Sequence, residues 1–221
     1  MDKYSILKQY YGHSAFRAGQ EALIDAILSG RDALCVMPTG GGKSLCYQIP
    51  ALLLPGITLV VSPLISLMKD QVAALKSAGI PAAYINSSLT GEQIRTVYAR
   101  TRKGAYKLIY VAPERLETNS FLSLMQEMDV SFLAVDEAHC ISQWGQDFRP
   151  SYLSIVDFIN ALPRRPIVAA YTATATKQVQ SDILRLLQLQ SPYRVVTGFD
   201  RPNLYFDVRR PKNKFSALAA L

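Results

Sequence analysis

The stretch that most restricts the fold of this chain is a glycine-rich loop between two apolar segments. Residues 37–44 read Met-Pro-Thr-Gly-Gly-Gly-Lys-Ser, after the apolar run 33–36 and before a helix-compatible run over 45–54. A strand that ends in such a turn and continues into a helix is the context of a phosphate-binding loop. Glycines let backbone N–H groups approach phosphate oxygens, and the helix N-terminus adds a favourable dipole. A merely flexible glycine turn is disfavoured by the strand before the loop and the Lys-Ser pair after it.

The side chains of this loop have separate expected roles. We expect Lys43 to reach the β- and γ-phosphates of a nucleotide, and the Ser44 hydroxyl to ligate Mg²⁺, which usually keeps several of its waters. Met37 stands where the strict pattern has glycine, which is a mild departure. The loop residues expected to bind ATP are Thr39, Gly40, Gly41, Gly42, Lys43 and Ser44.

The rest of the chain alternates short apolar runs with helical patterns. Most of the apolar runs show no polar alternation, as expected for strands that are covered on both faces. Thr90 and Gln93 form a capping-box pattern, which predicts a helix start. The alternation predicts an α/β fold of three layers, with a mostly parallel sheet flanked by helices. The expected strands are 33–36, 58–61, 82–85, 107–111, 132–135, 167–171 and 193–196, and the expected helices are 19–28, 64–76, 91–102, 151–162 and 177–187.

An acidic motif, Asp136-Glu137-Ala138-His139, directly follows the apolar run 132–135. A carboxylate at the carboxyl end of a buried strand points into the crevice where α/β folds bind ligands. We expect Asp136 to hold Mg²⁺, directly or through water, and Glu137 to orient and deprotonate an attacking water. Phosphoryl transfer needs a phosphate cradle, a metal ion and a positioned nucleophile, so Lys43, Asp136 and Glu137 are the expected catalytic residues. The alternative, an exposed acidic helix start, is disfavoured by the glycine-rich loop upstream.

A loop with aromatic residues comes next. Residues 142–150 contain Trp144, the only Trp of the chain, together with Gln143, Phe148 and Arg149. An aromatic pair with a cation suits stacking on nucleic-acid bases and contact with phosphate. The alternative is that Trp144 and Phe148 anchor the loop in the core, which is the commoner role of such residues in a loop without other context.

Two threonines follow the expected strand 167–171. Hydroxyls at the end of a strand, here those of Thr172 and Thr174, can bridge the nucleotide site and another surface. A helix N-cap at Thr176 or nearby is a second interpretation of the same segment, and both can hold together.

In order and context, these motifs resemble the first RecA-like motor domain of a superfamily 2 helicase, specifically of the RecQ family of DNA helicases. The acidic motif running straight into the aromatic loop is the most specific part of the resemblance. It covers about residues 5–210, and the other matching segments are 16–20, 62–64, 112–115 and 199–204.

The resemblance implies an ATP- and Mg²⁺-dependent DNA helicase that unwinds in the 3′→5′ direction. Arg17 and Gln20 match the family's adenine-reading motif, and a glutamine amide can pair with the N6/N7 edge of adenine. Ser62 lies in a motif that touches the DNA strand backbone. The aromatic loop with Gln143, Trp144, Phe148 and Arg149, and the threonines Thr172 and Thr174, match residues that couple DNA binding to hydrolysis.

The chain departs from the family pattern at three positions. The adenine-stacking position, usually Tyr, is His13; the family's Pro is Ala18; and Gln146 stands where His is common.

Two other functions remain open. An RNA helicase of the same superfamily usually has Asp where this chain has His139 and lacks the aromatic loop. A P-loop small-molecule kinase would show a lid signal and would not explain the threonine motif.

For domain organisation, we expect a RecA-like ATP-binding domain over 1–200. Residues 201–221 are expected to be a connector and the truncated start of a second RecA-like domain, with a strand over 204–208 and a helix from Lys214. We expect single-stranded and partly duplex DNA and that second domain as partners, and only weak activity of this chain alone. The formal charge of +7 is weak evidence for DNA binding, because residues 201–214 alone carry five Lys or Arg against one Asp.

Three cysteines, an odd number without Cys-x-x-Cys spacing, favour a reducing compartment and disfavour a zinc site. The N-terminus shows no signal-peptide pattern, and prolines and glycines interrupt the most apolar window, so we expect no membrane segment. The expected location is the cytoplasm, with association to the nucleoid if the protein is bacterial.

Overall fold

The computed structural model describes residues 1–198, 205, 207–208 and 210–219 of the chain. Its strands are β1 (Ala33–Val36), β2 (Ile57–Val61), β3 (Ala82–Ile85), β4 (Leu108–Val111), β5 (Val130–Val135), β6 (Ile167–Thr172) and β7 (Tyr193–Val196). They form one sheet in the order β3-β4-β2-β5-β6-β1-β7. Every pairing in it is parallel, so the predicted α/β fold with a parallel sheet is confirmed.

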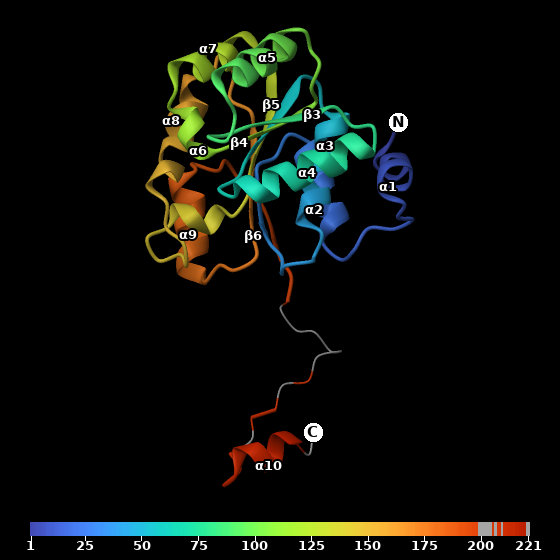
Figure 1. The fold of residues 1–221 in the computed structure, drawn as a ribbon. Coiled ribbons are helices and arrows are strands. Elements are labelled where there is room, and N and C mark those ends of the chain that lie inside the picture. The colour runs from blue at the N-terminus through green and yellow to red at the C-terminus, as the bar shows by residue number, and fades with distance from the viewer. Residues whose placement is uncertain (199–204, 206, 209, 220–221) are drawn as a thin grey trace.

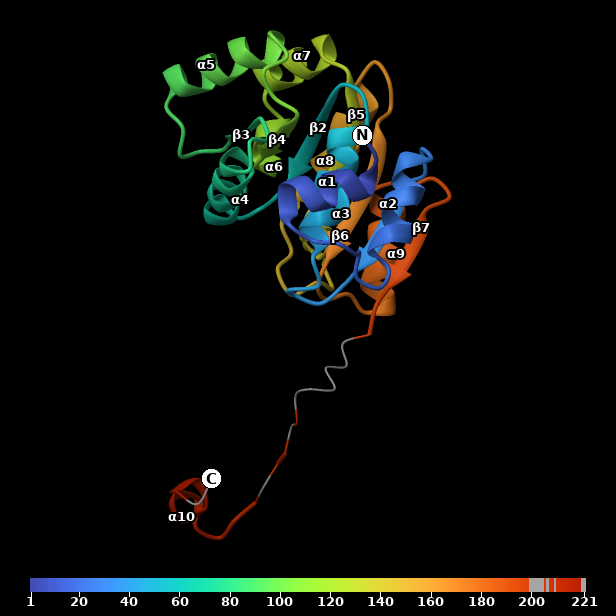
Figure 2. The same ribbon diagram turned by 90° about the vertical axis from the view of Figure 1, so that its right-hand side faces the viewer.

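Helices lie on both faces of this sheet (Figure 1). They are α1 (Lys3–Tyr11), α2 (Gln20–Leu28), α3 (Lys43–Leu53), α4 (Ile65–Ser77), α5 (Gly91–Arg102), α6 (Pro113–Leu116), α7 (Asn119–Glu127), α8 (Ser154–Ala161), α9 (Lys177–Leu186) and α10 (Lys214–Ala219), with 3-10 turns η1 (Ala138–Ile141) and η2 (Pro150–Tyr152). One core contains side chains of α2, α3 and α4, and the core of the other face contains side chains of α5 to α9. The α1 helix packs on α3 (Figure 2). Within the described part of the chain, no helix is long and apolar enough to cross a membrane.

Local sequence explains several of these elements directly. The strands are apolar because both faces are covered: all four residues of β1 and all six of β5 are buried. The capping box of α5 forms as predicted. Thr90 Oγ1 accepts a hydrogen bond from Gln93 N at 3.3 Å, and Gln93 Oε1 accepts one from Thr90 N at 2.9 Å. Helix α5 therefore begins and ends where the sequence predicts.

Some predicted boundaries are wrong. Helix α8 begins at Ser154 rather than at 151, because residues 150–152 form the separate turn η2 with Pro150 at its start. The helices α1, α6 and α7 were not predicted; α6 has four residues, which is too short to show helical periodicity. The predicted strand over 204–208 falls partly outside the described residues, and those described within it lie in no strand. Helix α10 begins at Lys214, as predicted.

A buried carboxylate joins three segments at the amino-terminal edge of the sheet. Asp32, which is 3% exposed, accepts hydrogen bonds from Arg165 Nη1 at 3.1 Å and Arg165 Nη2 at 2.6 Å. It also accepts from two backbone groups, Val168 N at 2.9 Å and Gln190 N at 2.7 Å. Asp32 thus fixes the start of β1 against the start of β6 and the segment before β7.

The carboxyl ends of the central strands meet at the opposite edge, where ligands bind in folds of this class. Met37 N donates to Thr172 O at 3.1 Å, and Asp136 N donates to the last carbonyl of β2 at 2.8 Å. On the outer side of β1, Thr197 N donates to Val36 O at 3.0 Å. The glycine-rich loop, the acidic motif and the threonine motif therefore start from neighbouring positions.

Candidate nucleotide-binding site and aromatic loop

The glycine-rich loop closes tightly onto the start of α2. Gln20 Nε2 donates to Gly41 O and Gly42 O, both at 3.2 Å. Gly42 has φ +81°, and a Cβ atom there would lie 2.3 Å from Gln20 Nε2. Both the backbone conformation and the space therefore require glycine at this position. Gly42 directly precedes Lys43, the first residue of α3, so the N-terminus of a helix of 11 residues faces the loop.

Lys43 holds its ammonium group inside the turn. Its Nζ donates to Met37 O at 3.1 Å and to Pro38 O at 3.4 Å. Both partners are neutral carbonyls, and among the described residues no carboxylate lies within ion-pair distance of Lys43 Nζ. An anionic phosphate group is the kind of partner that such an ammonium group binds.

Asp136 is a buried carboxyl group at the end of β5, 7% exposed. Its Oδ1 accepts a hydrogen bond from Glu137 N at 3.0 Å. Burial, followed by the negative charge of Glu137, raises the pKa of Asp136 to about 6, while the Glu137 N–H and the Lys43 charge act in the opposite direction. A carboxylate desolvated in this way gains from a nearby cation.

The donor set fits a magnesium ion. Asp136 supplies a carboxylate and Ser44 a hydroxyl, both line the same pocket, and both are the hard oxygen ligands that Mg²⁺ prefers. The structure does not bring a larger acidic set together: across the described ranges, no group of three or more His, Cys, Asp or Glu side chains is placed to hold a metal ion.

Glu137 has a left-handed backbone with φ +47°, which is unusual for a residue with a side chain and is found disproportionately at active sites. Its Oε2 lies 3.3 Å from His139 Nδ1, and the same ring nitrogen lies 2.9 Å from Thr172 Oγ1. His139 therefore joins the acidic motif to the end of β6. The sequence placed His139 in the motif but did not predict this contact, because it spans 33 residues.

A pocket of about 420 Å³ gathers these groups. It also contains the residues predicted to read adenine: Arg17 Nη1 donates to Gly40 O at 2.5 Å, and Arg17 N donates to Gln20 Oε1 at 2.8 Å. Ala15, Leu45 and Leu67 complete the lining and were missed, since apolar residues carry no chemical signal in a sequence. The predicted residues that line the pocket are His13, Arg17, Gln20, Thr39, Gly40, Gly42, Lys43, Ser44, Asp136 and Glu137.

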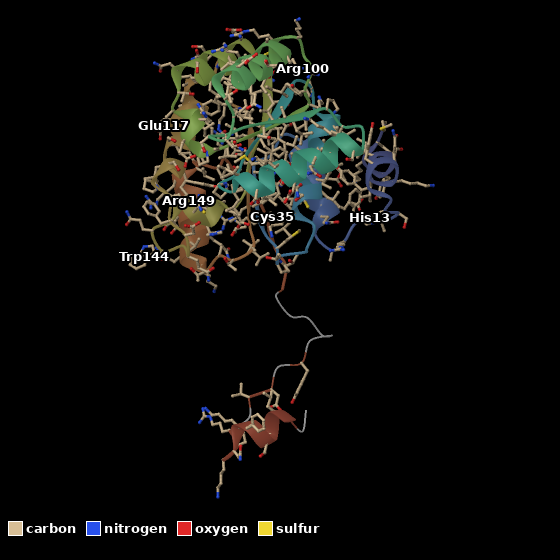
Figure 3. All side chains as sticks on the ribbon, viewed as in Figure 1. His13, Cys35, Arg100, Glu117, Trp144 and Arg149 are labelled. Atoms are coloured by element: carbon tan, nitrogen blue, oxygen red, sulfur yellow. The ribbon has the colours of Figure 1, made fainter. Side chains whose placement is uncertain are left out.

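The aromatic loop, residues 142–150, is buried at its first residue and exposed in its middle part. Trp144 is 74% exposed and stands at the periphery of the domain (Figure 3), so its side chain does not anchor the loop; Phe148 is half-buried. Arg149 donates from Nη2 to Asp147 Oδ2 at 2.8 Å and from Nη1 to Pro63 O at 3.2 Å. The second bond ties the aromatic loop to the predicted DNA-contacting segment 62–64.

The remaining predicted residues differ in exposure. Ser62 is 1% exposed, and among the described residues its Oγ finds no hydrogen-bond partner. Leu64 of the same motif is exposed. Thr172 is buried and its Oγ1 accepts from Thr174 N at 3.2 Å, whereas Thr174 is exposed. Thr176 caps α9 by accepting from Val179 N, as the second interpretation of this segment predicts.

Comparisons of the sequence with known proteins agree with this arrangement. Residues 17–182 match the protein family described as DEAD/DEAH box helicase. The protein named ATP-dependent DNA helicase RecQ of Bacillus subtilis is 51% identical over 211 residues, which are 95% of this chain and 36% of that protein. Its namesake in Haemophilus influenzae is 53% identical over 202 residues, 91% of this chain and 32% of that protein. The chain thus spans about a third of the length of these relatives.

Solved structures share the fold at low sequence identity. The helicase MrfA, solved with DNA and AMPPNP, superposes with a TM-score of 0.71 at 16% identity over 89% of this chain and 29% of its own. The helicase Lhr of Mycobacterium smegmatis, solved with single-stranded DNA and AMP-PNP, gives 0.66 at 21% identity over 85% of this chain and 26% of its own. Both share the fold of this chain. The chain therefore belongs to the DEAD/DEAH box helicase family and, within it, to the RecQ group.

Proposed function

We propose that this chain is the first motor lobe of an ATP-dependent DNA helicase of the RecQ type, which binds ATP with Mg²⁺ and couples its hydrolysis to movement along single-stranded DNA. The observation that carries the proposal is the single pocket that brings Lys43, Asp136 and Glu137 together at the carboxyl edge of the sheet. The RecQ relatives, which are named as DNA helicases, support DNA rather than RNA as the substrate.

The residues of the pocket divide the chemistry among them. Lys43 and the backbone N–H groups of the loop bind the phosphates, while His13, Arg17 and Gln20 line the same pocket and are assigned to the adenine by the family resemblance. Ser44 and Asp136 would hold Mg²⁺, which supplies charge neutralisation at the phosphates when bound. The Glu137 carboxylate orients the attacking water and accepts its proton, a role that general bases fill in phosphoryl transfer.

The coupling to DNA is proposed to run through the aromatic loop. Trp144 offers an exposed ring on which a base can stack, and such stacking tolerates any sequence. Arg149 links the same loop to the segment 62–64, which the family resemblance assigns to the strand backbone. The 3′→5′ direction, a second RecA-like domain as partner, partly duplex DNA as substrate, and a cytoplasmic or nucleoid location also rest on that resemblance.

Replacing Lys43 with alanine tests the nucleotide site. We expect binding of a fluorescent ATP analogue to weaken by roughly 100-fold or more, because the variant lacks the charge-assisted bond to the phosphates. The fold, followed by circular dichroism, should stay intact because the side chain lines a pocket. Lys69→Ala, at an exposed position on α4, is the matched control. Wild-type affinity in Lys43→Ala would contradict the proposed function.

The 221-residue chain alone should bind ATP weakly and show little DNA-stimulated ATPase. Helicase motors of this class need an arginine from the facing lobe to stabilise the transition state, an interaction worth about 10³–10⁵ in rate in related phosphoryl-transfer enzymes. Steady-state ATPase assays with and without single-stranded DNA measure this. Robust stimulated turnover by the monomeric chain would show that the lobe is catalytically complete.

In an enzyme that carries both lobes, Trp144→Ala should lower DNA-stimulated ATPase by about tenfold, since loss of one stacked base weakens binding by that order. Hydrolysis without DNA should stay unchanged, because Trp144 does not line the nucleotide pocket. Tyr4→Ala removes an exposed aromatic ring elsewhere and serves as the control. A stimulation curve equal to that of the wild type would exclude Trp144 from the coupling.

A further inference from the structure

A buried hydrogen bond holds the aromatic loop at its first residue. Ser142 Oγ donates to Asp182 Oδ2 at 2.7 Å; Ser142 is fully buried and Asp182 is 8% exposed. The same Ser142 oxygen accepts a hydrogen bond from Trp144 N at 3.2 Å. The carboxylate on α9 therefore reaches the backbone of Trp144 through one intervening hydroxyl.

The two oxygens of Asp182 have different partners. Oδ2 bonds to the aromatic loop, while Oδ1 accepts from Arg185 Nη2 at 3.1 Å, one turn further along α9. The Arg185 side chain is 70% exposed, so water competes for it. The Ser142 hydrogen bond, followed by that of Arg185, lowers the pKa of Asp182 below its ordinary value. The acceptor of the Ser142 proton is thus a carboxylate, which makes the stronger kind of hydrogen bond.

The Trp144 side chain is mostly outside the apolar core. The ring is 74% exposed at the periphery of the domain (Figure 3). A cavity of about 390 Å³ lies under the aromatic loop, lined by loop residues that include Trp144 and Phe148 and by α9 residues that include Gln178 and Asp182. Open space thus lies between part of the loop and α9, and the buried hydrogen bond at Ser142 attaches the loop to that helix.

Strand β6, which leads into α9, contacts the acidic motif of the nucleotide site. His139 Nδ1 contacts Thr172 Oγ1 at 2.9 Å, at the end of the strand that leads into α9. The turn η1 is therefore held from both sides by consecutive elements. His139 contacts Thr172 at the end of β6, and Ser142, just after the turn, bonds to Asp182 on α9. Glu137 directly precedes this turn, so the proposed base and the aromatic loop share one support.

We propose that Asp182 is a positioning residue for the aromatic loop, which fixes the backbone of Trp144 relative to Thr172 and hence to the nucleotide pocket. Asp182 does not line that pocket. The consequence for catalysis rests on the proposed function, because the position of Trp144 matters for turnover only where Trp144 contacts DNA. Small displacements of a contacting group can change rates greatly, which makes the support of the loop as important as its tip.

The single Trp of the chain makes the proposal measurable without nucleic acid. Time-resolved fluorescence anisotropy of the full 221-residue chain reports the motion of Trp144 on the nanosecond scale. In Asp182→Ala we expect the amplitude of the fast decay to rise about twofold, since the loop loses its anchor. Asp182→Asn retains an acceptor oxygen for the Ser142 hydroxyl and should restore a decay close to that of the wild type.

Two further variants test whether Asp182 acts on Trp144 through Ser142. Ser142→Ala should loosen Trp144 at least as much as Asp182→Ala, because it also removes the acceptor of Trp144 N. The double variant should equal Ser142→Ala, since both single changes break the bond between Ser142 and Asp182. Arg185→Ala is the matched control: it removes the other partner of Asp182 and leaves the Ser142 bond, so the decay should not change. Circular dichroism and affinity for a fluorescent ATP analogue should equal those of the wild type in every variant.

A titration with fluorescein-labelled oligothymidine adds the functional readout. Asp182→Ala should bind it more weakly than the wild type, by up to the roughly tenfold expected when one stacking contact is lost entirely. A folded Asp182→Ala variant with the wild-type Trp144 decay would overturn the positioning role, and so would an Arg185→Ala variant that loosens the loop equally. If Asp182→Ala does not fold, Ser142→Ala decides in its place. Should Trp144 loosen in a protein whose wild type binds no oligothymidine, the positioning role stands and the proposed function fails.

Discussion

Replacing Glu137 with glutamine, in an enzyme that carries both lobes, should lower the rate of ATP hydrolysis by about 10²–10⁴-fold, the usual contribution of a general base. The amide cannot accept the proton of the attacking water. It has nearly the same shape as the carboxylate, so the left-handed backbone at φ +47° is strained to the same degree in both proteins. Single-turnover hydrolysis measured in a quench-flow instrument separates this chemical step from product release.

Nucleotide affinity should stay close to that of the wild type in Glu137→Gln, because Lys43 and the glycine-rich loop are unchanged. Glu117→Gln provides the control: Glu117 is exposed at the end of α6 (Figure 3), outside the pocket. A Glu137→Gln enzyme that hydrolyses ATP at more than a tenth of the wild-type rate would exclude Glu137 as the base and would leave water activation to another group.

The largest expected effect on stability is at Asp32. Asp32→Ala should lower the free energy of unfolding by roughly 2–4 kcal/mol. The change leaves Val168 N and Gln190 N without their acceptor and removes the buried partner of the ion pair with Arg165. Arg165 keeps 29% of its side chain exposed and recovers part of the loss from water, so the value lies below that of a fully buried pair. Urea denaturation followed by circular dichroism measures the change.

A surface pair supplies the comparison for Asp32. Asp129 bonds Arg164 at 2.6 Å with both side chains about half exposed or more, so Asp129→Ala should cost less than about 1 kcal/mol. Equal losses in the two variants would mean that the network around Asp32 does not hold the three segments together. Nucleotide binding per folded molecule should be unaffected in both, since both residues lie at the edge of the sheet opposite the pocket.

The elements that could be predicted from sequence are those encoded over a few neighbouring residues. The glycine-rich loop, the capping box of α5 and the apolar strands are of this kind. The contacts that complete the site are not: His139 meets Thr172 across 33 residues, Ser142 meets Asp182 across 40, and Arg165 meets Asp32 across 133. Each depends on the order of strands in the sheet, which the alternation of strands and helices does not specify.

The exposure of single side chains was equally inaccessible from sequence. An aromatic residue in a loop is more often buried than not, yet Trp144 is exposed while Ser62, a small polar residue in a predicted contact motif, is buried. Both outcomes follow from tertiary packing around β2 and η1 rather than from residue type. The residue types in a sequence therefore indicate which side chains can do the chemistry, but not how accessible each of them is.

The place of β7 at the rim of the sheet has a mechanical consequence. β7 runs parallel to β1, and Thr197 N just beyond it bonds to Val36 O, the last residue before the glycine-rich loop begins. Tension applied to the backbone after Thr197 loads the β1–β7 ladder along its length, so its hydrogen bonds resist together in shear rather than opening one at a time. A force applied there therefore acts through the β1–β7 strand pair on the backbone directly next to the glycine-rich loop.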